Sequence, residues 1–201
     1  MMIGRFHFSL VVLIVAVLCG CASLPPGSNF LKSASSALAH PHETRLGKQF
    51  ESAAREHDGN SGYRIIPVGA DGFLTRMQMI NSAERTLDLQ YFIFRGDETG
   101  QQLTRAVLHA ADRGVRVRVL VDDGETVDGD DQISMLEAHP SVEVRIFNPF
   151  AYRGHNLMFR AFEFMLNASR LDYRMHNKLL VVDNSIALIG GRNIGVSLFI
   201  Y

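Results

Sequence analysis

The sequence predicts an α/β domain whose sheet is mixed, mostly parallel and flanked by helices. From about residue 63 onward, segments with helical spacing of apolar residues alternate with short segments of strand type. The chain has 201 residues, of which 47% are hydrophobic and 20% are charged. That composition suffices for one packed domain and excludes a mainly disordered chain.

The first half of this domain is predicted as helix, strand, helix and strand. Residues 73–80 carry Phe, Met and Ile at helical spacing. The segment LDLQYFIF at 87–94 alternates and then becomes fully apolar, as in a strand that enters a sheet. Apolar residues over 103–110 mark a second helix, which Arg113–Gly114 ends. The segment VRVRVLV at 115–121 has the period of two that is typical of a strand.

The second half continues the alternation with shorter elements. A short helix is expected around residues 135–136, and residues 142–146 predict a further strand. Two short strands, 179–182 and 186–189, flank a turn signal at 183–185.

The N-terminus carries an export signal. Arg5 precedes a nine-residue apolar run at 10–18, and nine helical residues span roughly 14 Å, about half of a bilayer core. The run ends in LCGC followed by Ala22, which resembles a bacterial lipobox. Residues 1–20 are expected to be a lipoprotein signal peptide, with lipid on Cys21; an ordinary signal peptide is the alternative. Ala22 rather than Asp favours a lipid anchor in the outer membrane of the cell envelope.

Residues 21–62 are expected to be a tether, and residues 63–201 the folded domain. The tether is rich in Pro, Ser and Ala, and it holds a weak amphipathic helix signal over 43–56 before a loop signal at 58–62. The two cysteines, Cys19 and Cys21, are the only ones in the chain. A disulfide framework, a thiolate metal cluster and a cysteine nucleophile in the domain are therefore excluded.

Chemistry concentrates between His176 and Asn193. His176 and Lys178 are two residues apart at the start of a strand, so both side chains point to one face. An imidazole beside a fixed cation suits an anionic oxygen, and the Asn193 amide adds a donor. Gly190 and Gly191 permit close backbone approach. Asp183 follows His176 by seven residues and is expected, from this spacing, to shape a turn.

These residues resemble the signature of the phospholipase D superfamily, His-x-Lys-x4-Asp-x6-Gly-(Gly/Ser)-x-Asn, which runs here without a gap over 176–193. Upstream segments resemble the first half of bacterial cardiolipin-synthase-like proteins, so the resemblance implies a phospholipase D-like half-domain. It implies that His176 is a nucleophile forming a phosphohistidine and that Lys178 and Asp183 complete the catalytic motif. Lys178, Asn193 and Gly191 would hold the substrate phosphate, and neither a metal nor a cofactor is needed.

The implied reaction is phosphatidyl transfer or phosphodiester hydrolysis on a phospholipid, at a membrane to which Cys21 ties the chain. The superfamily usually pairs two motifs, whereas this chain has one and continues from Asn193 into six apolar and polar residues, 196–201. We therefore expect an apparently truncated chain that is weak or inactive alone, unless a homodimer pairs two motifs. The alternatives are a non-catalytic fragment that binds phosphate or lipid, and a nuclease of the same superfamily.

Three further segments allow two interpretations each. The formal net charge is −1, so we do not expect nucleic acid as a partner. Residues 145–178 hold more basic than acidic side chains, which could attract a lipid phosphate or could simply be solvated. Six acidic residues crowd positions 122–131, which favours a solvated loop over an adventitious cation site. The apolar stretch 158–166 favours a core helix over a lipid-facing or lid segment.

Overall fold

The computed structural model describes residues 34–58, 60–124, 129–152, 154 and 156–196. Its contacts group the chain into two compact units, one including Asn148–Tyr173 and the other Leu31–Phe147 with Arg174–Tyr201. The predicted signal peptide and Cys21 lie outside the described residues.

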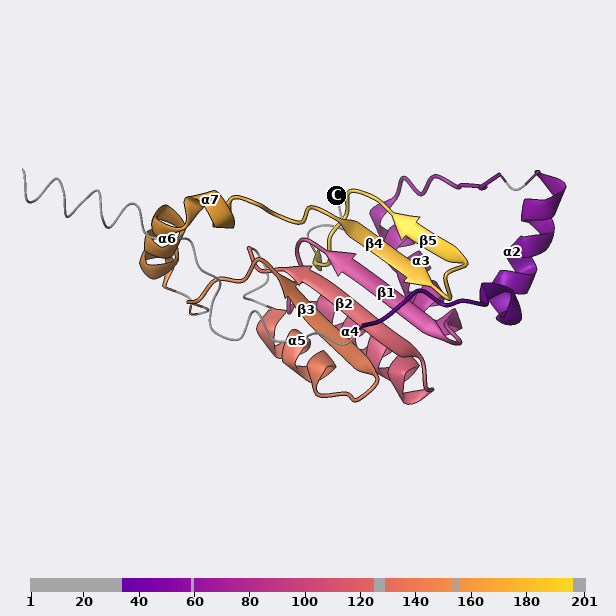
Figure 1. Cartoon of the computed structure of the whole chain (residues 1–201), viewed down its shortest axis with the longest axis horizontal. Coiled ribbons are helices and arrows are strands. Elements are labelled where there is room, and N and C mark those ends of the chain that lie inside the picture. The colour runs from indigo at the N-terminus through magenta and orange to yellow at the C-terminus, as the bar shows by residue number, and fades with distance from the viewer. Residues whose placement is uncertain (1–33, 59, 125–128, 153, 155, 197–201) are drawn as a thin grey trace, which may run out of the picture. The chain divides into compact units, whose positions relative to one another are not determined.

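The larger unit holds a five-stranded sheet in the order β3-β2-β1-β4-β5 (Figure 1). The strands are β1 (Thr86–Tyr91), β2 (Arg116–Asp122), β3 (Val142–Phe147), β4 (Lys178–Val182) and β5 (Ile186–Ile189). Strands β1, β2 and β3 pair in parallel, whereas β4 pairs antiparallel with both β1 and β5. Four of these strands therefore run one way and β4 runs against them, which confirms the predicted mixed, mostly parallel sheet.

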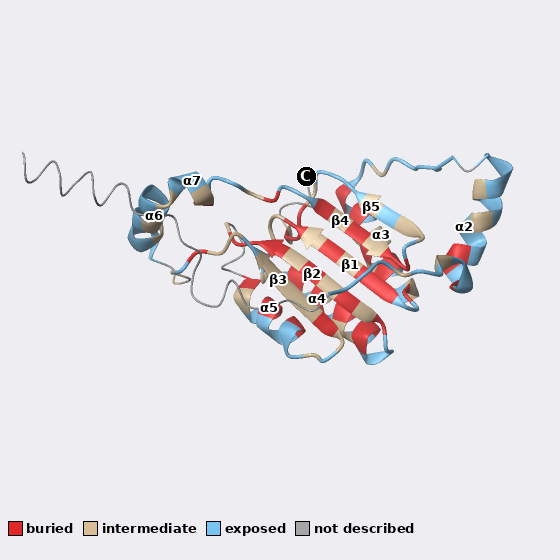
Figure 2. Cartoon of the chain, in the orientation of Figure 1, coloured by how far each residue is buried: buried red, intermediate tan, exposed pale blue. Residues whose placement is uncertain are grey.

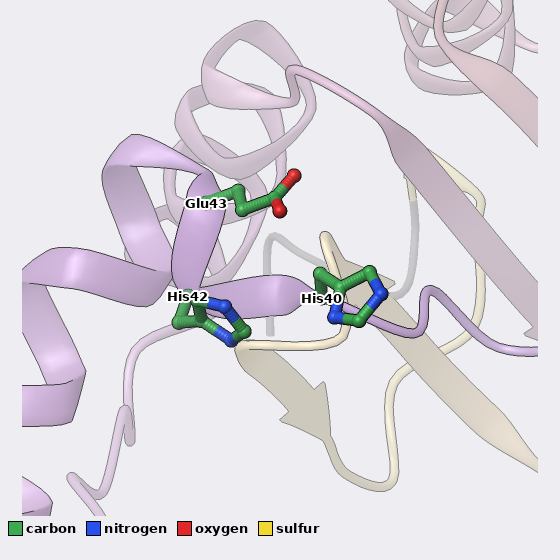
Figure 3. Close-up of side chains that lie close together, drawn as sticks. All are labelled: His40, His42 and Glu43. Carbon is green, nitrogen blue, oxygen red and sulfur yellow. The ribbon is translucent and has the colours of Figure 1, made fainter.

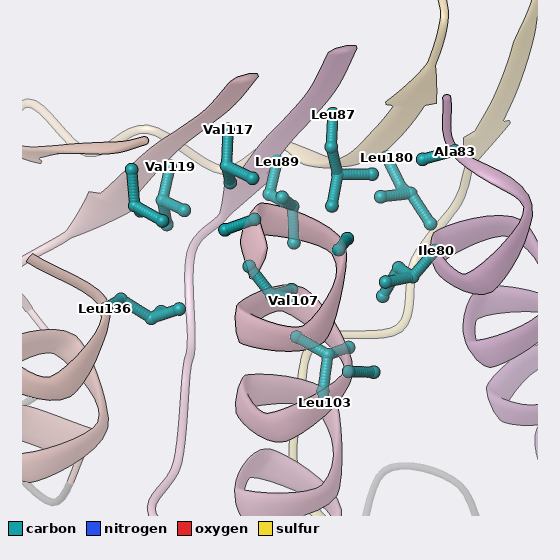
Figure 4. Packing of buried hydrophobic residues seen from close by; sticks show 14 of the residues in the cluster. Ile80, Ala83, Leu87, Leu89, Leu103, Val107, Val117, Val119, Leu136 and Leu180 are labelled. Atoms are coloured by element: carbon teal, nitrogen blue, oxygen red, sulfur yellow. The ribbon is translucent and has the colours of Figure 1, made fainter. Parts of the chain in front are cut away.

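Helices cover one face of the sheet. Figure 1 shows α3 (Gly69–Ser82), α4 (Glu98–Asp112) and α5 (Asp130–Glu137) behind the strands. Apolar side chains from these helices and from alternate strand positions meet in between, as Figure 4 shows for ten labelled residues. The strands β1, β2 and β4 accordingly hold most of the buried strand positions, whereas β3 and β5 at the two sides of the sheet are mostly intermediate or exposed (Figure 2). Burying this apolar surface is the main force that holds helices and sheet together.

The opposite face of the sheet is only partly covered. In β2 the odd-numbered positions are buried and Arg116, Arg118 and Leu120 are partly exposed, as the VRVRVLV alternation predicts. Arg118 of β2 pairs with Asp88, which is its direct neighbour on β1. A second bond from the Arg118 guanidinium to the Asp88 carboxylate measures 2.8 Å.

The predicted elements are found with shifted ends. Helix α4 begins after Asp97 and ends before Arg113, and Gly114 has φ 89°, a left-handed conformation that favours glycine. The strand predicted over 87–94 stops at Tyr91. Beyond Tyr91, the Ile93 carbonyl oxygen accepts a hydrogen bond from the Ile194 N–H at 3.1 Å. The residues after β1 therefore pair with the end of the motif instead of continuing the strand.

The helix expected before the domain is α2 (Arg45–Glu56), preceded by the short 3-10 turn η1 (Pro41–Glu43). Thr44 caps α2, because its Oγ1 accepts a hydrogen bond from the Gly47 N–H at 3.0 Å. The Arg45 N–H donates to Glu84 at 2.9 Å, which ties the start of α2 to the residues just before β1.

The smaller unit contains α6 (Leu157–Leu166) and α7 (Ala168–Leu171). The Glu163 carboxylate accepts the backbone N–H groups of Ala151 at 2.7 Å and Tyr152 at 2.9 Å, which folds the preceding segment against α6. No residue of α6 is buried, so the expected core helix over this apolar stretch is wrong. Among the described helices, none combines the length and apolarity needed to cross a membrane.

Candidate functional site

The first residues of the predicted motif, His176 and Lys178, lie at one edge of the sheet. Lys178, the first residue of β4, is the register partner of Tyr91, the last residue of β1. Because β1 and β2 are parallel, their carboxyl ends meet the start of β4 at the same edge. In open α/β sheets, ligands bind outside the carboxyl ends of the strands.

His176 and Lys178 come together around Phe92. The exposed His176 ring stacks on the Phe92 ring, with centroids 4.2 Å apart and planes at 30°. Lys178 is 7% exposed, and its Nζ lies 5.1 Å from the centre of the same ring. The ammonium donates to the His176 carbonyl oxygen at 2.8 Å. Burial lowers the pKa of Lys178, because the charged ammonium has lost contact with water. A bound anion can replace the lost stabilisation.

Asn193 joins the same edge from the end of the motif. The side chain is 6% exposed, and its Oδ1 accepts the Ile93 N–H at 3.0 Å. The amide NH₂ group is then the part of the side chain that can donate to a ligand. Because Ile93 directly follows Phe92, the same stretch of chain positions both halves of the motif.

Gly190 and Gly191 are both exposed, and Gly191 is the one predicted to contact the substrate phosphate. A Cβ at either position would meet no atom of the described chain within 4 Å, apart from the residues directly before and after it. Packing within the described chain therefore does not explain these glycines.

Asp183 lies at the far end of β4 from His176 and Lys178, and it is fully buried. Its carboxylate accepts the backbone N–H groups of Glu84 at 3.0 Å, Arg85 at 2.8 Å and Thr86 at 2.9 Å. A five-residue strand is roughly 17 Å long, so this carboxylate cannot touch a phosphate held at the other end. The geometry agrees with the turn role that its spacing predicts. The catalytic role that the resemblance implies for Asp183 stays a prediction.

Asp122 supports the motif and was not predicted to do so. Its carboxylate is fully buried at the end of β2. It accepts hydrogen bonds from the Met175 backbone N–H and from the Arg174 guanidinium, each at 2.8 Å. It thereby fixes the backbone directly before His176. The solvated-loop interpretation is wrong for Asp122 and for the equally buried Asp123. The signal available in the sequence was their position immediately after an apolar strand.

Arg76 holds the other end of the motif. It is 2% exposed, and it donates to the Tyr91 hydroxyl at 3.1 Å and to the Arg192 carbonyl oxygen at 3.1 Å. Burial raises the pKa of Tyr91, although the Arg76 charge opposes this shift. Arg76 lies three residues after Phe73 and four before Ile80, so its place on the apolar face was visible in the sequence.

Asp97 adds a further tie at the end of the motif segment. It caps α4 by accepting the Gly100 N–H at 3.2 Å, and it also accepts the Val196 N–H at 2.7 Å. Burial by itself raises the pKa of Asp97, but the hydrogen bonds from Val196, Thr99 and Gly100 together hold this pKa below its ordinary value.

Residues 77–199 match the family model described as "Cardiolipin synthase, PLD-like domain". The chain belongs to this family. The matched region includes β1 to β5 and the whole motif, so the resemblance inferred from His176 to Asn193 is confirmed at the level of the family.

Several cardiolipin synthases are similar to this PLD-like chain. Cardiolipin synthase C of Escherichia coli K12 is 42% identical over 155 residues, which is 77% of this chain and 32% of that protein. The major cardiolipin synthase ClsA of Bacillus subtilis 168 is 35% identical over 133 residues, or 65% of this chain and 25% of that protein. The chain thus spans about a third or less of the length of these relatives.

Solved structures of PLD-type proteins have more distant similarity. NucT from Helicobacter pylori aligns with a TM-score of 0.48 and 20% identity, covering 66% of this chain and 72% of that one. Nuc from Salmonella typhimurium, a phospholipase D family member, aligns with a TM-score of 0.41 and 18% identity, covering 62% and 66%.

Proposed function

We propose that this chain is the first catalytic half of an enzyme that breaks and remakes phosphodiester bonds in phospholipids. The observation that carries the proposal is the pairing of an exposed imidazole, His176, with a buried ammonium, Lys178, at the ligand-binding edge of the sheet. Membership of the cardiolipin synthase PLD-like family supports a phospholipid as the substrate class.

In this proposal His176 is the nucleophile. One ring nitrogen attacks phosphorus, the P–O bond to the first alcohol breaks, and a phosphohistidine forms. Water or a second alcohol then attacks phosphorus, loses its proton, and breaks the P–N bond. Lys178 and the Asn193 NH₂ group stabilise the negative charge that gathers on the phosphoryl oxygens. The charge of Lys178 is effective because burial removes competing water.

The leaving alcohol needs a proton in the first step. This chain carries one His-x-Lys motif, and general acid help contributes roughly 10²–10⁴-fold to such a reaction. We propose that a second imidazole comes either from a second copy of the chain or from the additional length that the relatives have. Their greater length supports the second source.

The proposal is tested with phosphatidylglycerol in mixed micelles. The 201-residue chain should show little or no turnover. A version extended to a second motif should release glycerol, and it should form phosphatidic acid if water is the acceptor or cardiolipin if a second phosphatidylglycerol is. His176→Ala should abolish that turnover, and His109→Ala, an exposed histidine outside the motif, should not. Acid-labile phosphate on His176 of the extended protein would support the nucleophile role.

Three results would contradict the proposal. Turnover that survives His176→Ala would remove His176 from the chemistry. Cleavage of single-stranded DNA by the extended protein, without any reaction on phospholipid, would favour the nuclease alternative. If phosphate shifted the resonances of Lys178 and Asn193 but no form of the protein turned over substrate, the motif would be a phosphate-binding site only.

A further inference from the structure

We propose that His40, His42 and Glu43 form a binding site for a divalent transition-metal ion, at the turn where the N-terminal segment enters the domain. Figure 3 shows the three side chains gathered at η1. One nitrogen of each imidazole and one oxygen of the Glu43 carboxylate all lie within 4.8 Å of one another. They are the one such group of three or more His, Cys, Asp or Glu side chains found among the described residues.

The distances are close to what an ion requires. Zinc ligands of these types lie about 2.0–2.2 Å from the metal, so two ligands of a tetrahedral site are roughly 3.4 Å apart. All three side chains are exposed, and the two imidazole rings meet edge to face with centroids 5.7 Å apart. Small side-chain rotations therefore suffice to bring the three donor atoms around one ion, and the remaining coordination position stays open to water.

The backbone beneath the three ligands is fixed before any ion binds. Pro41 has a restricted φ, and its carbonyl oxygen accepts the Thr44 N–H at 3.0 Å and the Thr44 hydroxyl at 2.7 Å. The Glu43 N–H donates to the His40 carbonyl oxygen at 3.2 Å. Gly47 lies so close that a Cβ there would be 1.8 Å from the Pro41 oxygen, so the first turn of α2 packs directly on η1. Little ordering of the backbone is left for the ion to impose.

The donor set selects the class of ion. Two neutral imidazoles and one carboxylate suit zinc and neighbouring first-row ions, whereas magnesium prefers oxygen ligands and retains its water. The single negative charge of Glu43 offsets part of the charge of the ion.

The site is separate from the proposed catalytic edge. Residues near η1 bond the other end of the sheet: Arg45 bonds Glu84, just before β1, and Asn184, just after β4, donates to the Leu38 carbonyl oxygen at 3.4 Å. His176 precedes β4 at the opposite end, a strand length away. A bound ion would therefore stabilise the turn at η1, a strand length away from the proposed reaction.

The test is a titration of the untagged full chain, in detergent, with zinc chloride alone. We expect one saturable site per chain, visible by calorimetry and by shifts of the His40 and His42 ring resonances. H40A/H42A should lose it. H40A alone and E43Q should each weaken binding at least about tenfold, since even loss of a residue behind a ligand costs roughly 10- to 100-fold. A matched double variant of exposed histidines, H57A/H109A, should bind as the unchanged chain does.

The proposal is overturned if H40A/H42A keeps the same affinity and stoichiometry, or if the control loses binding equally. Unchanged affinity in E43Q would exclude the three-ligand site, and equal binding of magnesium would exclude the predicted selectivity. Because all three ligands are exposed, the variants should unfold at the same temperature as the unchanged chain in the absence of zinc.

Discussion

Asp183 shows how one buried carboxylate joins two strands that are distant in the sequence. Asp183 and Asn184 have φ values of 51° and 49°, and the Ser185 N–H donates to the Val182 carbonyl oxygen at 3.0 Å. This is a tight turn with both central residues left-handed, which Asn and Asp tolerate better than most residues. The turn aims the carboxylate at the backbone before β1.

Asp183→Ala should destabilise the domain without removing any group from the proposed site. The carboxylate serves three backbone N–H donors, and a buried donor left without an acceptor costs roughly 1–3 kcal/mol. Urea unfolding should show a loss of about 2–4 kcal/mol. The exposed Asp131→Ala is the control and should change stability by less than about 0.5 kcal/mol. Equal stability of both variants would contradict the structural role.

At the scale of elements, the segment before β4 depends on the end of β2. Asp122 bonds both Arg174 and Met175, which lie 52 and 53 residues further along the chain. The residues that carry His176 therefore have a fixed conformation although they belong to no strand or helix.

Asp122→Ala should loosen this segment. Amide hydrogen exchange at Met175 should accelerate strongly, because its N–H loses a buried acceptor. In the extended protein the variant should lower kcat more than it raises KM, since a mobile His176 reacts poorly even when substrate binds. Asp88→Ala, which breaks the Arg118 ion pair on the open face of the sheet, is the matched control. If both variants affected exchange at Met175 equally, Asp122 would have no special role.

The exposed helix α6 should govern the solubility of the protein rather than its stability. Both charged side chains of α6 contact the segment that precedes the helix. Arg160 lies over the Phe150 ring at 4.6 Å, and Glu163 accepts hydrogen bonds from two backbone N–H groups. Phe162 and Met165 are 60% and 74% exposed. Exposed apolar patches of this kind promote association.

Phe162→Ser with Met165→Ser should raise the soluble fraction and leave the unfolding temperature unchanged. Leu136→Ser is the contrasting variant, because Leu136 is fully buried in the core and its loss should lower that temperature. Light scattering and thermal unfolding separate the two effects. A clear loss of thermal stability in the double variant would mean that α6 packs inside the protein.

At the scale of the whole molecule, we propose that lipid on Cys21 holds the chain at the outer membrane of the cell envelope. The proposal rests on the charged start, the nine-residue apolar run and the LCGC sequence. Cys21→Ser should leave an unlipidated precursor, detected by mass spectrometry and by the loss of labelled fatty acid. Cys19→Ser is the control and should be processed normally. A mature protein that begins beyond Cys21 and carries no lipid would refute the anchor.

The sequence by itself determined the elements and the segment to which we assign the chemistry. Helices and strands follow from the spacing of apolar residues, which is a local property, and His176, Lys178 and Asn193 belong to one short motif. The turn role of Asp183 was also predictable, because turn chemistry depends on neighbouring residues.

Only the tertiary structure decided which distant residues hold that motif in place. Phe92 and Arg76 contact it across 84 and 116 residues of chain, and Asp122 bonds Met175, directly before it, across 53 residues. Such contacts depend on the strand order, in which β4 inserts antiparallel beside β1. The spacing of apolar residues within a segment does not predict this strand order, because the strand order depends on the free energy of the whole core rather than of any one segment.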